Sequence, residues 1–257
     1  MDSTVLAVVV ATVLAALGGL FVPALIGRIP PHVPDETVEE PTPVGSEIDG
    51  TVDATPATAP PEPPEPYADI ARLPGLGWKS AVAAAVAGAL VGVALGWTWA
   101  LVLWEPLVPV SVALAVVDWR TRLLPTAVIR PTYAALVVLV LLGWVVTGDS
   151  DTVVRAALGW LVAGGLFAIL WFIYPRGLGY GDVRLAGLLG IALGWVGWGT
   201  LLVGVYAGFL LGGVIGGLLA VLKIVERKGV PFGPFMLLGA LVGLLWGEPL
   251  WSSLVSG

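Results

Sequence analysis

The chain has 257 residues, of which 58% belong to the hydrophobic set and 12% are charged, and its mean hydropathy is +0.96. This composition excludes an ordinary soluble globular domain and predicts a membrane protein. With no cysteine and a single histidine, His32, the sequence also excludes a disulfide, a thiolate zinc site, a cysteine nucleophile and a membrane-embedded Ser-His triad, which leaves carboxylates as the expected catalytic groups.

The first apolar run and a polar segment make up the amino-terminal part of the chain. The run at 4–27 has the roughly twenty residues that a bilayer core requires, and no positive charge precedes it, so we predict a true first span within 1–27. Residues 28–79 are rich in Pro, Glu, Asp and Thr, and ten of the eighteen acidic residues fall between 35 and 69. Such a segment buries too little apolar surface to offset the entropy of ordering. We therefore predict a disordered linker at 28–79.

Apolar runs divide the rest of the chain, 80–257, into further spans. The runs at 80–117 and 185–222 would each reach about 57 Å as one helix, nearly twice a bilayer core of roughly 30 Å, so each is expected to form two spans. The turns within these runs are expected near 97–109 and 194–199, and single spans at 131–146, 152–174 and 232–251. The sequence thus predicts an all-α, polytopic membrane bundle of about eight transmembrane helices.

Lysine and arginine are distributed unevenly over these spans. If the amino terminus is outside, eleven of the twelve basic residues fall in cytoplasmic segments and only Arg155 falls outside. Cytoplasmic loops carry such an excess of positive charge. We therefore predict a multi-pass protein of the cell (inner) membrane with its amino terminus outside, a chance asymmetry being the alternative.

Two aspartates stand out because of their place in this topology. Asp118 ends the third predicted span and Asp182 begins the sixth, both on the cytoplasmic side. An acid at the edge of a membrane bundle is costly unless it is solvated or paired, which favours a functional role. The alternative is that each acid simply marks where a helix ends.

The sequence around Asp182 supports a functional role. Residues 177–185 read GLGYGDVRL, and the alternating glycines, Gly179 and Gly181 among them, are expected to permit positive φ and a close approach of a substrate main chain. Glycine is abundant in this chain, and such glycines can also serve helix packing alone. A GxGD tetrapeptide at the start of a span, with a second aspartate at the same level, is more specific.

At this point the sequence resembles the type IV prepilin peptidases, which are membrane aspartic proteases with a GxGD motif. Three stretches carry the resemblance, namely VDWRTRLLP at 117–125, GYGDVRL at 179–185 and VPFGPF at 230–235. The family usually has lysine where this chain has Arg184. The resemblance implies that 80–257 is a transmembrane peptidase domain with Asp118 and Asp182 as its catalytic pair, and that Gly179 and Gly181 support the motif.

The same resemblance sets expectations about cofactors and partners. Many family members carry a segment with two CxxC pairs after the first span, which binds zinc and is associated with methylating the new amino terminus. Here the cysteine-free linker takes that place, so we expect no metal, no cofactor and a peptidase without methyltransferase activity. The implied partners are prepilin or pseudopilin precursors, whose short basic leader precedes an apolar segment, together with membrane lipid, and no nucleic acid.

Helix ends suggest roles for the two acids. Asp118 is expected at a helix C-terminus, whose partial negative charge favours the protonated form, and Asp182 at an N-terminus, which favours the carboxylate. The hypothesis is that Asp182 is the base and Asp118 the acid. The alternatives are a proton-coupled transporter that uses the same acids as a relay, and an inactive scaffold for pilus assembly. Glu105 and Glu248 are expected to cap spans at the outer side.

Overall fold

The computed structural model describes residues 2–31, 64–175, 177–222 and 231–255. In these ranges all regular secondary structure is helical, so the predicted all-α class is confirmed. The helices are α1 (Ser3–Leu20), α2 (Val22–Gly27), α3 (Tyr67–Ala71), α4 (Leu76–Leu95), α5 (Trp99–Trp104), α6 (Leu107–Thr121), α7 (Thr126–Thr147), α8 (Ser150–Ile173), α9 (Tyr180–Val196), α10 (Trp198–Val221) and α11 (Gly233–Val255).

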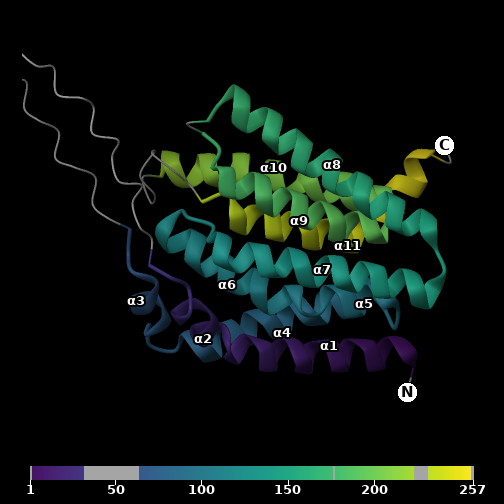
Figure 1. Ribbon diagram of the computed structural model, residues 1–257, viewed down its shortest axis with the longest axis horizontal. Coiled ribbons are helices and arrows are strands. Elements are labelled where there is room, and N and C mark those ends of the chain that lie inside the picture. The colour runs from purple at the N-terminus through teal and green to yellow at the C-terminus, as the bar shows by residue number, and fades with distance from the viewer. Residues whose placement is uncertain (1, 32–63, 176, 223–230, 256–257) are drawn as a thin grey trace, which may run out of the picture.

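Most of these helices are long enough to cross a bilayer. Within the described ranges, seven segments have the length and apolar composition of a membrane span, namely α1, α4, α5 together with α6, α7, α8, α10 and α11. α9 has 17 residues, or about 26 Å at 1.5 Å per residue, and is largely buried among the others. The long helices run alongside one another, and both termini lie at the same end of the bundle (Figure 1). The protein is a multi-pass helical membrane protein.

Close helix packing depends on glycine and is strongest within three antiparallel pairs, α1 with α4, α8 with α9, and α10 with α11. A Cβ atom at Gly159 of α8 would collide with the backbone of Gly190 in α9, and the reverse substitution would collide with Gly159. Gly239 of α11 meets the backbone of Gly208 in α10 in the same way. Apolar side chains gain little by moving from lipid tails to another helix, so helix association in a membrane depends on close packing. Small residues permit this close packing.

Two of the predicted span limits need correction. The continuous helix predicted at 4–27 is broken at Phe21, because Pro23 has no N–H with which to continue the hydrogen-bond ladder. The connection between the two spans of the 80–117 run was predicted near 97–109. It is shorter in the structure and covers only residues 96–98. Pro106 and Pro109 lie at the start of α6, where a missing N–H costs nothing, so they do not mark the turn.

The predicted linker differs from the structure at its carboxyl-terminal end. Residues 32–63 lie outside the described residues, and for them the linker stays a prediction. Further on, Tyr67 and Ile70 are buried, and through them α3 packs against α2 and α6. Glu65 forms a bidentate ion pair with Arg120, with both oxygen–nitrogen distances at 2.7 Å. The range 28–79 therefore extends too far, because a few apolar residues and one ion pair suffice to fix the segment beside the bundle.

Candidate active site

Asp118 lies in the last turn of α6. The helix ends because Arg122 takes a left-handed backbone conformation (φ 57°, ψ 26°) and its N–H donates to the Asp118 carbonyl at 2.8 Å. The Asp118 side chain is 3% exposed, and its Oδ2 accepts a hydrogen bond from the Gly233 N–H at 2.9 Å. Gly233 is the first residue of α11. The carboxylate therefore lies at the N-terminus of a helix that is 115 residues away in the sequence.

Asp182 is held at the start of its own helix. It is the third residue of α9, and its Oδ2 accepts a hydrogen bond from the N–H of Gly179, the N-cap residue, at 2.9 Å. This is the half of a capping box in which an acid reaches back to the N-cap backbone. An acid in the first turn of a helix also interacts favourably with the helix dipole. The Asp182 side chain is buried, like that of Asp118.

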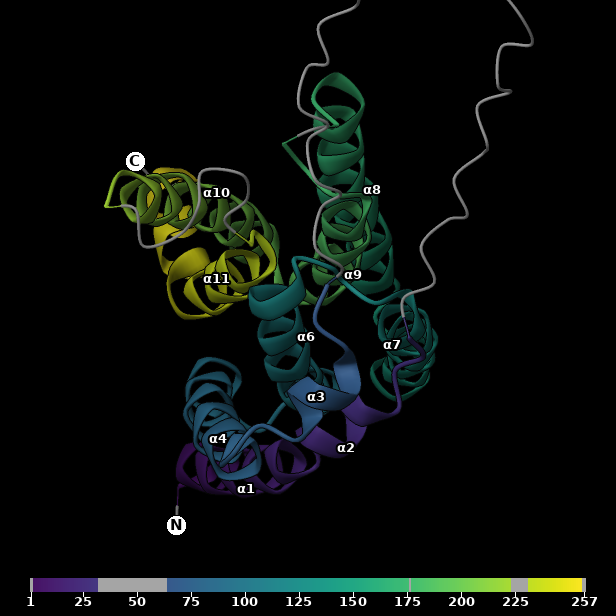
Figure 2. The ribbon, with the colours of Figure 1, turned by 90° about the vertical axis from the view of Figure 1, so that its left-hand side faces the viewer.

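The two aspartates share one cavity of about 250 Å³. In both carboxylates Oδ1 has no hydrogen bond to the described part of the chain. Each acid is thus fixed through one oxygen and has the other available. The cavity is lined by the two acids and by residues from α3, the α6–α7 connection and the start of α9, including Tyr67, Leu124, Thr126, Tyr180 and Arg184. Figure 2 views the bundle from this end, where α3 lies in front of α6.

The glycines of the GxGD stretch do not act in the expected way. Gly179 has φ −77°, and the described glycines with positive φ lie elsewhere, at positions 75, 96 and 148. The expectation of positive φ in the motif is therefore wrong. Gly181 instead allows close packing, since a Cβ there would lie 2.8 Å from Cβ of Leu124. This contact holds the start of α9 against the chain that follows α6, and so holds the two acids at one cavity.

Two residues beside the acids, Gly233 and Tyr67, could not be assigned from the sequence. Gly233 lies in the VPFGPF stretch, which received no chemical role, and a Cβ at this position would come within 2.7 Å of Asp118 Oδ2. Tyr67 lines the cavity from within the range predicted to be a disordered linker. The glycine and proline pattern around Gly233 was the available signal for the first. Tyr67 is the first apolar residue after a run of prolines and acids, which is a weak signal.

The other charged residues singled out from the sequence make no hydrogen bond to the acid pair within the described residues, although Arg184 lines the same cavity. Arg184 lies over the Tyr180 ring at 5.1 Å and donates to Thr126 Oγ1. Glu248 accepts a hydrogen bond from the Thr200 N–H at 3.1 Å near the start of α10, which confirms its capping role. Glu105 is the C-cap residue of α5, where its N–H donates to the Leu101 carbonyl at 2.9 Å, so its expected place at a helix end is confirmed. Its carboxylate oxygens are buried and have no hydrogen-bond partner among the described residues.

The cavity offers oxygen ligands from two carboxylates. In the described ranges no group of three or more His, Asp or Glu side chains is placed to hold a metal ion. The groups at the cavity that can act chemically include the two acids and the backbone N–H groups beside them. Two buried carboxylates at one cavity are suited to accept and donate a proton in turn.

The fold and this site define a polytopic helical membrane protein with a buried acid pair at one end of its bundle. Residues 106–221, a range that includes both Asp118 and Asp182, match the type IV leader peptidase family. The prepilin leader peptidase/N-methyltransferase of Escherichia coli strain K12 is 34% identical over 176 residues, which are 63% of this chain and 70% of that protein. The chain belongs to the type IV leader peptidase family.

Further relatives agree with this assignment. The leader peptidase HopD of Escherichia coli is 36% identical over 116 residues, covering 42% of this chain and 69% of that protein. The prepilin leader peptidase/N-methyltransferase of Aeromonas salmonicida strain A449 is 33% identical over 144 residues, covering 55% of this chain. The chain spans about half the length of this Aeromonas relative, 48%. No solved structure matches the chain.

Proposed function

We propose that the protein is an aspartic endopeptidase that removes the basic leader from type IV prepilin-like precursors, including pseudopilins. The observation that carries the proposal is the meeting of Asp118 and Asp182 at one cavity, each fixed through a single oxygen. Membership of the leader peptidase family and the names of the relatives support the choice of substrate.

The acids would act as a pair. Hydrolysis needs one group to take a proton from the attacking water and another to give a proton to the carbonyl oxygen or the leaving nitrogen. Two neighbouring carboxylates share one proton, because two adjacent negative charges are unfavourable, so one acid is poised as base and the other as acid. The cavity between them has room for water and for a stretch of substrate main chain.

Helix dipoles give less guidance on the two roles than the sequence suggested. Asp118 lies at the C-terminus of α6, but its Oδ2 bonds the first N–H of α11. Both carboxylates therefore face the positive end of a helix, and the partial charges of α6 and α11 oppose each other at Asp118. We retain Asp182 as the base, because its described hydrogen bond places it at the N-terminus of α9 and at no opposing helix end. The pair titrates as a unit, so this describes its dominant state.

The acid pair would lie at the cytoplasmic face of the inner membrane. Of the described basic residues, Arg28, Arg72, Lys79, Arg120, Arg122, Arg130 and Arg184 belong to segments at the same end of the bundle as the acids, and Arg155 belongs to the other end. The excess of positive charge on cytoplasmic segments supports this orientation, with the amino terminus outside. A basic leader would then reach the cavity from the cytoplasm, and bulk lipid would surround the bundle.

The main alternative, a proton-coupled transporter, is disfavoured by the position of the acids. Relay acids generally lie inside the bundle near the middle of the membrane, whereas both acids here lie at one end of the helices. A scaffold without activity would have no need of two carboxylates facing one cavity. We also propose that the protein cleaves without methylating, because no cysteine is available for the zinc-binding segment of the bifunctional relatives.

Substitution of each acid tests the proposal. We expect Asp118→Asn and Asp182→Asn each to lower cleavage of a co-expressed type IV prepilin by about 10²- to 10⁴-fold, the usual contribution of acid–base groups. Asp151→Asn is a matched control, since Asp151 is exposed at the other end of the bundle. Cleavage is measured by the size shift of the precursor on a gel. Persistent cleavage in both acid variants would rule out the aspartic mechanism.

A further inference from the structure

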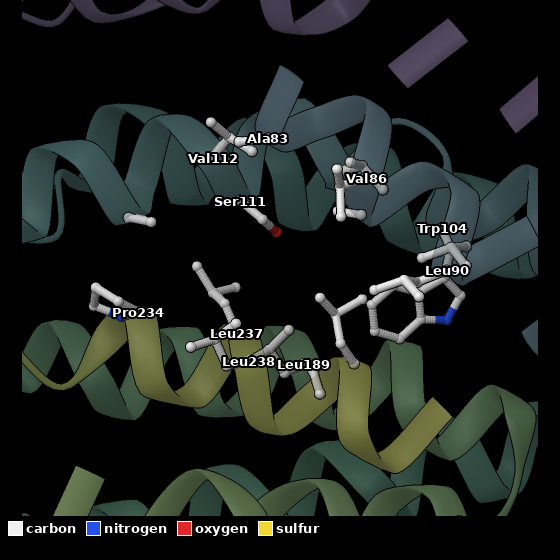
Figure 3. Close-up of a pocket in the computed structure, with 16 residues that line it drawn as sticks. Ala83, Val86, Leu90, Trp104, Ser111, Val112, Leu189, Pro234, Leu237 and Leu238 are labelled. Carbon is white, nitrogen blue, oxygen red and sulfur yellow. The ribbon is translucent and has the colours of Figure 1, made fainter. Parts of the chain in front are cut away.

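A second cavity, of about 510 Å³, lies between α4, α6 and α11 (Figure 3). Figure 3 shows side chains of α4 and α6 facing side chains of α11 across it, with Pro234 toward one end and Trp104 at the other. We call this cavity the apolar groove. It is defined by Ala83 and Val86 of α4, Ser111 and Ala115 of α6, and Pro234 and Leu238 of α11.

The apolar groove leads to the acid pair. Val108, Ser111 and Ala115 line it at helical spacings of three and four residues, and the next position on this face of α6 is Asp118. On the opposite wall, Pro234 follows directly after Gly233, whose N–H is bonded to Asp118. The last lining residue of α6, Ala115, is therefore three residues, or about 4.5 Å along the axis, from the acid. The groove thus ends close to Asp118, which lines the acid cavity.

The groove is lined almost wholly by carbon. The Trp104 N–H is used elsewhere, since Nε1 donates to the Ala192 carbonyl at 3.2 Å. Ser111 is the exception, and its hydroxyl has no hydrogen bond to the described residues and points into the groove. Hydroxyls on other long helices, such as those of Thr12 and Thr132, bond the carbonyl four residues earlier. The groove thus offers an apolar surface with one unused hydroxyl.

The groove is also open at the side of the bundle. Val86 and Leu238, on its two walls, are 58% and 48% exposed. Alanines on both α4 and α6 line it, and small side chains at such positions let another helix come close. An occupant could therefore enter from the surrounding lipid without unfolding any described helix.

We propose that the apolar groove binds the membrane-embedded helix of the substrate, with the bond to be cleaved at the Asp118 end. This inference rests on the proposed peptidase function. From Trp104 to Ala115 the groove runs for about 16 Å along the helix axis, which corresponds to about three turns of a bound helix. One face of an apolar helix would fill it, and a polar group about two turns from the cleaved bond would meet Ser111.

The position of the groove explains how a membrane helix could be cut. A chain inside the bilayer must be helical, since every backbone polar group needs an internal partner there, and a helical peptide bond is shielded from attack. At the Asp118 end the bound helix would leave the groove and its chain could extend across the acid cavity. The groove would thus set which bond reaches the acids by holding the helix that follows it.

Photocrosslinking tests the occupant of the groove directly. The full chain carrying Asp182→Asn, which prevents turnover, is reconstituted with a type IV prepilin that has its leader and apolar segment, and with a photoreactive residue at position 83 or 238. We expect crosslinks to the apolar segment of the prepilin from both positions. Position 142 is the control, because Leu142 is 48% exposed on α7 outside the groove. Crosslinks from 83 and 238 only to lipid, or only to a second copy of the chain, overturn the proposal.

Filling the groove tests its role in cleavage. Ala83→Trp places a large side chain in the groove at an exposed position, and we expect kcat/KM for the prepilin to fall by about tenfold or more, mainly through KM. Ala135→Trp, at an exposed position on α7, is the matched control and should cleave normally. Normal cleavage by Ala83→Trp contradicts the groove proposal. Absence of cleavage by the unaltered chain contradicts the peptidase function instead, so the two failures are distinguishable.

Discussion

The two ends of the bundle use the same local arrangement for different purposes. At one end, Asp118 accepts a hydrogen bond from the start of α11 and lies against Gly233. At the other end, Glu248 accepts a hydrogen bond near the start of α10 and lies against Gly197. Both are carboxylates that stabilise a helix N-terminus from a different helix. Only Asp118 has a second acid beside it at a cavity.

A buried acid is therefore not a functional signal by itself. The cap formed by Glu248 would stabilise the bundle in any helical membrane protein. Asp118 serves as a cap too, and its chemistry depends on Asp182 reaching the same cavity from another helix. Substitutions at the two ends should therefore separate catalysis from stability.

The largest contrast is expected between the two glycines. In Gly233→Ala the added Cβ would lie 2.7 Å from Asp118 Oδ2 and displace the carboxylate, so we expect cleavage to fall by about 10²-fold, as for other small misplacements of catalytic groups. Gly197→Ala should disturb Glu248 and lower the melting temperature while leaving kcat unchanged. Prepilin cleavage and thermal unfolding in detergent measure the two effects. Equal losses of kcat in both variants would remove the distinction between the ends.

A large loss of stability without loss of chemistry is expected from Arg155→Ala. Arg155 donates to the carbonyl oxygens of Gly194 and Trp195 at 2.8 and 2.9 Å and so closes the C-terminus of α9. Charge-assisted bonds of this kind are worth about 1.5–3 kcal/mol. We expect a loss of that order in unfolding experiments in mixed micelles, with unchanged cleavage below the melting temperature. Arg130→Ala, at an exposed position, is the control.

A smaller effect is expected from Glu248. Glu248→Ala removes the acceptor for the Thr200 N–H and should cost about 1 kcal/mol, as loss of a helix cap typically does. Glu248→Gln keeps an acceptor oxygen and should recover most of that loss. If Glu248→Gln instead lowers kcat, Glu248 has a role in catalysis that this comparison does not assign to it.

The smallest effect is expected from the exposed pair Glu65–Arg120. The hydrogen bond from Arg120 lowers the pKa of Glu65. A lowered pKa means that the pair stabilises the fold above the ordinary glutamate pKa, and that this stabilisation is lost as the pH falls through the lowered value. Because both side chains are partly exposed, at 42% and 29%, Glu65→Gln should cost less than about 1 kcal/mol at pH 7. The difference from the unaltered chain should vanish in acid and shrink in high salt.

Much of the architecture could be predicted from the sequence. Helix length against bilayer thickness was enough to divide the two 38-residue runs, and the resulting order of spans was enough to bring Asp118 and Asp182 to one end. Helix interruptions were harder to place, because Pro23 and Pro106 both lie where a helix restarts, at α2 and α6, inside runs whose apolar composition is continuous.

The candidate site was predictable only in part. The hydrogen bond between Asp118 and Gly233 joins residues 115 positions apart, so no local pattern could reveal it. The bond also brings the positive end of the α11 dipole to Asp118. The predicted protonation of Asp118 considered the negative end of α6 alone. Tyr67 was overlooked because the many prolines and acids of 28–79 dominate the composition of that range. The burial of two apolar side chains is nevertheless enough to fix α3.

The glycine packing has a mechanical consequence. Contacts are densest within the three helix pairs and sparser between them, while Asp118, Asp182 and Gly233 belong respectively to α6, the α8–α9 pair and the α10–α11 pair. The spacing of the two acids is therefore set at the looser joints of the bundle. Membrane thickness and lateral pressure tilt helices at modest cost, so they act on these joints before they disturb any pair. The bilayer thereby helps to set the spacing of the two carboxylates.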